Sequence, residues 1–108
     1  MKIDILVFDG CPSAEATCIL VKQIVAEENV PADIVIKEVN SLDDARPYRF
    51  LGSPTVYVNG LDIEPARREE TNDDMSCRIY RTAQGGSGVP PAEMIREAIR
   101  SASDGNVQ

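Results

Sequence analysis

Polar and apolar residues alternate at the start of the chain and then give way to an apolar run. This pattern, in residues 2–8, predicts a strand that is buried on both faces. Between Ser13 and about Asn29 the apolar residues recur every three or four positions, which predicts a helix. Pro12 suits the first turn of that helix because no N–H is needed there. Residues 32–39 are rich in valine and isoleucine and predict a second strand.

A short helix and a hairpin are expected next. Residues 41–52 begin with Ser41, a good helix N-cap, and end with Gly52, a good helix terminator. Asn59 and Gly60 then separate two runs that are rich in β-forming residues. This dipeptide is the strongest sequence signal for a two-residue hairpin turn, so the two runs are predicted to pair antiparallel.

The part of the chain after the hairpin gives weaker signals. A charged stretch is followed by alternation in residues 75–81, which predicts an extended segment with Cys77 facing the interior and Arg78 on the opposite side. A loop rich in glycine and proline then leads to residues 91–102, whose apolar spacing predicts an amphipathic helix. Residues 104–108 are expected to fray.

The order of these elements predicts an α/β fold. A β-α-β unit implies a right-handed crossover between parallel strands, and the hairpin adds antiparallel ones. We therefore expect a mixed four-stranded core sheet with helices on both faces. One domain would span residues 1–103, with residues 65–90 inserted before the last helix and residues 104–108 as a tail.

Composition narrows the function. The chain of 108 residues suffices for one domain, and 43% hydrophobic and 27% charged residues are ordinary for a globular protein. The net charge of −7 disfavours nucleic acid and anionic membranes as partners, because both need a basic surface. The chain has no histidine, which excludes His-based nucleophilic and acid–base catalysis and His-ligated zinc.

The N-terminal segment does not have the pattern of a signal peptide. Asp4 interrupts its apolar run, which ends after Phe8. No stretch approaches the roughly 20 apolar residues that are needed to span a bilayer. We therefore expect a cytoplasmic protein, and its three cysteines are expected to be thiols or to form a transient disulfide because that compartment is reducing.

Cys11 is the first candidate for chemistry. It lies in the turn between the first strand and the first helix, where a helix N-terminus favours the thiolate; the alternative is an inert buried thiol. Cys18 is an unsuitable partner, because seven residues of helix rise by about 10 Å and disulfide Cα atoms lie within about 7 Å. Its spacing places it in the core with Val21 and Val25.

Cys77 is the other thiol that the fold could bring to Cys11. Three interpretations stay open: a resolving thiol for Cys11, a second ligand for a soft metal, or a buried strand residue. Glu15, one helical turn after Cys11, would accept a proton or would only complement the helix dipole. Asp9, directly before the turn, is an alternative acid or base.

Two motifs resemble the thioredoxin-like superfamily. GCPS, at the first strand-to-helix turn, resembles the active-site turn with its nucleophilic cysteine, and GSPTVYVNG, before the hairpin, resembles the loop that carries a cis-proline. The resemblance implies a thioredoxin-like fold and a cis bond before Pro54. It also implies substrate binding by Pro12, Ser53, Pro54 and Thr55, with backbone hydrogen bonds to an extended substrate.

A narrower resemblance is carried by GCPSAEAT, FLGSPTVYVNG, CRIY and GVPP. These segments resemble small bacterial thioredoxin-like proteins that are often labelled organomercurial (alkylmercury) lyase-like, some with selenocysteine at the position of Cys11. Ala14 stands where redox members of the superfamily have a second cysteine. The resemblance therefore does not imply the standard disulfide cycle between two neighbouring cysteines.

Three functions remain open from the sequence. The first is a thiol-dependent oxidoreductase in which Cys11 attacks a disulfide or peroxide and Cys77, or external glutathione, resolves the product. The second is a soft-metal or organomercury protein that uses Cys11, Cys77 and a neighbouring carboxylate. The third is a non-enzymatic interaction module. No cofactor is expected, the partner would be a protein or small-molecule thiol or disulfide, and the oligomeric state is left undecided.

Overall fold

A β-α-β unit opens the chain in the computed structural model, which describes residues 1–46, 50–70, 74–82 and 85–105. Strand β1 (Lys2–Val7) is followed by helix α1 (Ala14–Glu28) and strand β2 (Asp33–Glu38). The helix ends at Asn29, whose φ of 52° is left-handed. β1 and β2 pair in parallel, as the sequence predicts for two strands joined by a helical crossover.

The predicted hairpin completes the main sheet. Strands β4 (Thr55–Val58) and β5 (Leu61–Asp62) pair antiparallel, and β4 also pairs antiparallel with β1. The turn residues Asn59 and Gly60 have φ angles of 51° and 84°, which is the conformation that favours this dipeptide. The sheet order is β2-β1-β4-β5, so the expected mixed four-stranded sheet is confirmed.

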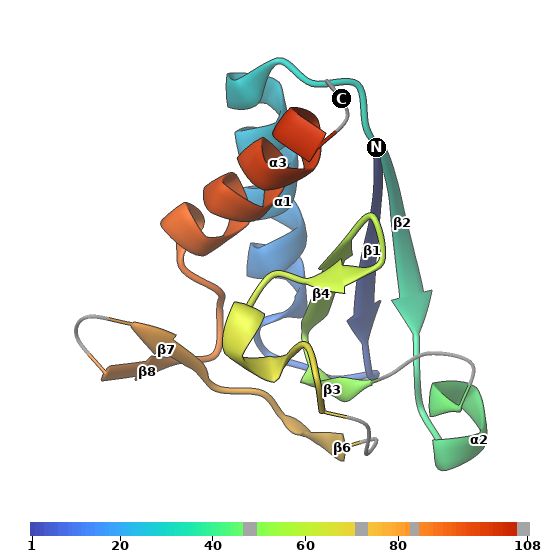
Figure 1. Cartoon of the computed structure of the whole chain (residues 1–108). Coiled ribbons are helices and arrows are strands. Elements are labelled where there is room, and N and C mark those ends of the chain that lie inside the picture. The colour runs from blue at the N-terminus through green and yellow to red at the C-terminus, as the bar shows by residue number, and fades with distance from the viewer. Residues whose placement is uncertain (47–49, 71–73, 83–84, 106–108) are drawn as a thin grey trace.

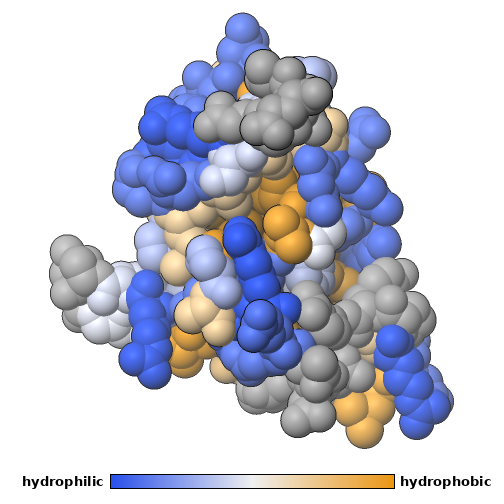
Figure 2. Space-filling model, in the orientation of Figure 1, coloured by the Kyte–Doolittle hydropathy of each residue, from blue (hydrophilic) through white to orange (hydrophobic). Residues whose placement is uncertain are grey.

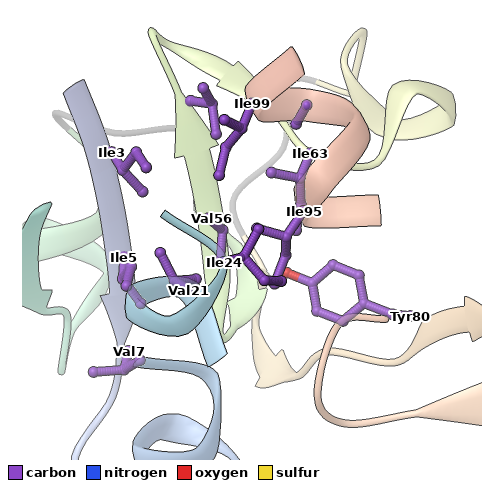
Figure 3. Packing of buried hydrophobic residues seen from close by; sticks show 12 residues of the cluster. Ile3, Ile5, Val7, Val21, Ile24, Val56, Ile63, Tyr80, Ile95 and Ile99 are labelled. Atoms are coloured by element: carbon purple, nitrogen blue, oxygen red, sulfur yellow. The ribbon is translucent and has the colours of Figure 1, made fainter. Parts of the chain in front are cut away.

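Two helices cover one face of this sheet (Figure 1). α1 and the C-terminal helix α3 (Ala92–Gly105) pack side by side there, whereas the short helix α2 (Leu42–Ala45) adds only Ala45 to a smaller apolar cluster with Leu6 and Tyr57. Figure 3 shows apolar side chains from β1, β4, α1 and α3 converging between the layers. Each fully buried isoleucine there contributes about 1.5 to 3 kcal/mol by leaving water. The fully buried apolar residues of this cluster include Ile3, Ile5, Val21, Val56, Ile95 and Ile99.

α2 is shorter than the sequence suggested. Its N-cap is confirmed, because the Ser41 hydroxyl accepts a hydrogen bond from the Asp44 N–H at 3.1 Å. However, the helix ends at Ala45, and Gly52 lies inside strand β3 (Leu51–Ser53) instead of closing a helix. Pro47, a residue that would limit a helix over residues 41–52, lies outside the described residues.

The insertion contains more regular structure than expected. It holds a 3₁₀ turn (Pro65–Arg67) and the strands β6 (Asp74–Cys77), β7 (Tyr80–Thr82) and β8 (Gly85–Ser87). β6 pairs in parallel with β3, and β7 pairs antiparallel with β8. The prediction of a loop was therefore wrong over β8, where main-chain pairing overrides the low strand propensity of glycine.

The predicted orientation of Cys77 was also wrong. Cys77 and Ile79 are exposed, whereas Arg78 and Tyr80 are only 2% and 0% exposed. Alternation fixes which residues share a face but not which face is inside, and arginine is among the residues that are rarely buried unless they are paired.

At the C-terminus, α3 continues to Gly105, so residues 104 and 105 belong to the helix and not to a frayed tail. Residues 106–108, for which fraying was also expected, lie outside the described part of the chain. Among the described residues, no helix combines the length and the apolar character needed to cross a membrane.

Candidate functional site

Cys11 lies in a tight turn between β1 and α1. Its N–H donates a hydrogen bond to the Phe8 carbonyl at 3.2 Å, and its own carbonyl accepts one from the Ala14 N–H at 3.3 Å. Gly10 has a φ of 80°, which a residue with a Cβ adopts only under strain. Cys11 is half-buried and precedes the first residue of α1 by three positions, so the turn presents its thiol near the start of that helix.

The loop before the hairpin is tied to this turn. The Ser53–Pro54 peptide bond is cis, as predicted. The Ser53 hydroxyl accepts a hydrogen bond from the backbone N–H of Phe8 at 3.2 Å, three residues before Cys11. The Thr55 hydroxyl donates to the Gly52 carbonyl at 2.5 Å and so closes the loop around Pro54. Because these loop residues are buried, their conformation is fixed by the surrounding chain.

Ser53 also contacts the segment that carries Cys77. In the parallel pair of β3 and β6, Ser53 and Cys77 are register partners. The Ser53 carbonyl accepts a hydrogen bond from the Arg78 N–H at 3.0 Å. Ser53 was expected to offer backbone hydrogen bonds to an extended substrate, and its carbonyl is thus already bonded within the chain.

The structure therefore brings Cys77 to the Pro54 loop, which is itself bonded to the strand end before Cys11. All three cysteines are free thiols. Pairing between the Cys11 and Cys77 sulfur atoms stays a prediction.

A buried ionic cluster fixes the residue after Cys77. The Arg78 guanidinium donates two hydrogen bonds to the Asp62 carboxylate, at 2.7 and 2.8 Å, and one to Glu64 at 3.1 Å. The side chains of Arg78 and Asp62 are fully buried and that of Glu64 is 9% exposed. Burial acts to lower the pKa of Arg78, but the hydrogen bonds and charge of Asp62 outweigh it and raise that pKa.

Tyr80 extends this cluster to the proline loop. Its ring lies 4.3 Å from the Arg78 guanidinium carbon, and its hydroxyl donates a hydrogen bond to the Pro54 carbonyl at 2.5 Å. Burial raises the pKa of the Tyr80 phenol, which therefore stays protonated. Figure 3 shows Tyr80 at the side of the apolar cluster that faces the insertion. The insertion is thus anchored to both the hairpin and the Pro54 loop.

The sequence interpretation missed this cluster, although a signal was present. Asp62 and Glu64 are two positions apart in an extended segment, and so are Arg78 and Tyr80. Residues two apart in extended chain share a face, so two acids on one segment and a cation with an aromatic ring on another were candidates to pair.

Other residues named from the sequence lie as follows. Pro12, Glu15 and Asp9 are exposed around the turn, and a proton-transfer role for Glu15 stays a prediction. Cys18 is half-buried and packs against the main apolar cluster, on the side of the helix that the sequence predicted to face the core, and burial raises the pKa of its thiol.

Gly88 is a neighbour of the turn that the sequence did not reveal. A Cβ on Gly88 would lie 2.5 Å from the Ser13 hydroxyl oxygen, so the segment before α3 passes close to the Cys11 turn. Only a residue without a side chain fits that approach without displacing Ser13.

Within the described ranges, no three cysteine, aspartate or glutamate side chains gather closely enough to hold a metal ion. Two adjoining hollows, of about 460 and 310 Å³, lie between α3 and the hairpin and share Arg68, Ala98 and Ser101 in their walls. Figure 2 shows hydrophobic surface in the middle of this side of the molecule, with hydrophilic residues around it. Neither hollow is lined by Cys11 or Cys77.

Comparisons of the chain with protein-family models, with curated proteins and with solved structures found no match.

Proposed function

We propose that the protein is a thiol-dependent oxidoreductase of thioredoxin-like architecture in which Cys11 is the nucleophile and Cys77 is the resolving thiol. One observation carries this proposal. Ser53 bonds through its hydroxyl to Phe8, at the base of the Cys11 turn, and pairs through its backbone with the strand that ends in Cys77. Two segments from distant parts of the chain, one leading to Cys11 and one ending in Cys77, thus both bond to the same buried residue.

The chemistry needs only these two thiols and an oxidised substrate. The Cys11 thiolate attacks one sulfur of a disulfide, forms a mixed disulfide and releases one thiolate. The Cys77 thiolate then attacks the Cys11 Sγ, forms the Cys11–Cys77 disulfide and releases the second thiolate. Two electrons pass from the protein to the substrate, and the two cysteine protons end on the released thiols. With a peroxide, the Cys11 thiolate attacks one peroxide oxygen, the O–O bond breaks, and Cys11 becomes a sulfenic acid while the other oxygen leaves as an alcohol or as water. Attack by Cys77 on the Cys11 Sγ then forms the disulfide and releases water.

The test uses a Cys18→Ala variant, in which Cys11 and Cys77 are the remaining thiols. After mild oxidation, peptide mapping should find an intramolecular link between Cys11 and Cys77. Before oxidation, iodoacetamide should label Cys11 in this variant and should do so faster than it labels Cys18 in the wild type. Persistent mixed disulfides on Cys11, or dimers linked through it, would contradict resolution by Cys77. Slow labelling of Cys11 would contradict its role as nucleophile.

Titration with mercury(II) distinguishes the soft-metal function from the redox function. A site formed by both thiols should bind one ion per chain, and either Cys11→Ser or Cys77→Ser should weaken that binding. Tight binding of this kind in a protein that reduces neither disulfides nor peroxides would favour the metal function over the redox one.

A further inference from the structure

We infer that this site acts on low-molecular-weight disulfides and excludes extended polypeptide disulfides, because β6 occupies the strand edge beside it. This inference rests on the proposed function of Cys11. It concerns what can reach the thiol, and the evidence for it lies in β3, β6 and the buried cluster that holds them together.

The edge of β3 that an extended peptide would need is already occupied. An extended peptide binds a sheet edge by pairing with free backbone N–H and C=O groups. Here the edge of β3 is paired with β6 from Leu51 to Ser53, and the Ser53 carbonyl accepts the Arg78 N–H. Leu51 and Ser53 are each 1% exposed. A peptide could therefore add to this edge only by displacing β6.

β6 also resists displacement from that edge. Its last residue, Cys77, precedes Arg78, and the Arg78 guanidinium is bonded to the carboxylates of Asp62 and Glu64. Withdrawing Arg78 would leave two buried acids without their cation, which is far less favourable than losing an exposed ion pair. Tyr80 would also leave the Pro54 carbonyl without its hydrogen bond. We call these four residues, Arg78, Tyr80 and the two acids, the lock. The lock holds β6 in place without using either thiol, so both thiols remain free to react.

Both thiols remain accessible to a small molecule while β6 is in place. Cys77 is exposed and Cys11 is half-buried, so neither thiol is sealed inside the protein. A compact disulfide can approach the Cys11 sulfur without pairing to a strand. It would oxidise the two thiols to one protein disulfide and leave as two small thiols.

The experiment compares two oxidants on the Cys18→Ala protein. One is glutathione disulfide, and the other is the symmetric disulfide of a short extended peptide. Each rate of thiol release is divided by the rate at which the same disulfide reacts with N-acetylcysteine, which removes the intrinsic difference between the two compounds. We expect the normalised rate with the peptide to be lower by about tenfold or more, because the edge it needs is filled.

Variants of the lock test the cause. Arg78→Lys keeps the charge but loses the paired hydrogen bonds, and Tyr80→Phe loses only the bond to the Pro54 carbonyl. Exchange of the backbone amide hydrogen at position 78 reports, in each variant, whether β6 has loosened. In a variant whose β6 has loosened, the normalised rate with the peptide disulfide should rise towards the normalised rate with glutathione disulfide. The matched control is Arg81→Lys, at an exposed position of β7, which should change neither rate.

Equal normalised rates for the two disulfides on the Cys18→Ala protein, in which β6 is unchanged, would overturn this inference and leave the proposed function standing. A loosened β6 with no gain for the peptide would also overturn it. Failure of both disulfides to react at Cys11 would overturn the proposed function, and this inference with it.

Discussion

Arg78 donates two hydrogen bonds to the carboxylate of Asp62, over 2.7 and 2.8 Å, in a place where both side chains are fully buried. The two residues are 16 positions apart, so their ion pair joins the inserted segment to the hairpin. Because Cys77 is the neighbour of Arg78, the same pair fixes where the backbone of Cys77 lies. The position of a surface thiol is thus set by charges that have no contact with solvent.

Replacing Arg78 by Met should destabilise the fold strongly. The change removes the cation from two buried acids, which typically costs about 3 to 5 kcal/mol. Urea unfolding followed by circular dichroism measures the loss. Arg81→Met, at an exposed position, is the matched control and should stay within about 0.5 kcal/mol. A loss below about 1 kcal/mol for Arg78→Met would show that the buried pair contributes little net stability.

Cys18 should be the slowest of the three cysteines to react with iodoacetamide. Burial raises the pKa of its thiol above the ordinary 9.0, so at neutral pH a smaller fraction is thiolate, and the thiolate is the reactive form. Raising the pH should increase its labelling rate up to and beyond pH 9. Mass spectrometry of the labelled peptides gives the three rates in one experiment. Labelling of Cys18 that is as fast as that of exposed Cys77 would contradict its assignment to the core.

Much of the fold followed from periodicity. β1, α1, β2 and the two hairpin strands were predicted because each has an apolar pattern of its own type, whereas β3 lies where a helix was predicted to end. The Asn59–Gly60 turn was predicted because few residues adopt its left-handed φ angles. The insertion was harder to predict. β6 and β8 are both short; β6 pairs with a strand that is distant in the sequence, and β8 is itself rich in glycine, so the local pattern carries little information about them.

The residues of the candidate site also differ in how far the local sequence predicts them. Cys11 and Pro54 could be named because a local motif surrounds each of them. The buried position of Arg78 could not be derived from its own segment, since an arginine is interior only where acids face it from elsewhere in the fold. Two interior acids at Asp62 and Glu64 require a buried cation such as Arg78. Because Cys77 is next to Arg78 in an extended segment, it must then face outwards, as observed.

Replacing Ser53 by Ala should both destabilise the fold and slow disulfide formation between Cys11 and Cys77. The variant leaves the Phe8 N–H without the acceptor that it has at 3.2 Å, at a cost of about 1 to 3 kcal/mol. It also frees the base of the Cys11 turn from the Pro54 loop.

Urea unfolding measures the first effect, and the rate of intramolecular linkage in the Cys18→Ala background measures the second. Ser101→Ala, at an exposed position on α3, should alter neither. If Ser53→Ala lowers stability but leaves the rate unchanged, the hydroxyl only stabilises the loop and does not position the thiols.

The last prediction concerns Tyr80→Phe and its dependence on pH. At neutral pH the variant should be less stable by about 1 to 3 kcal/mol, because the buried Pro54 carbonyl loses its donor. Burial raises the pKa of Tyr80 in the folded state above the ordinary value of 10.0. Above pH 10 the phenol therefore ionises in the unfolded chain while it stays protonated in the folded one, and the wild type loses stability as the pH rises. Phenylalanine does not titrate, so the stability difference between the two proteins should narrow between about pH 9 and pH 11. Urea unfolding at these two pH values measures it, and a difference that stays constant would mean that Tyr80 ionises equally easily in both states.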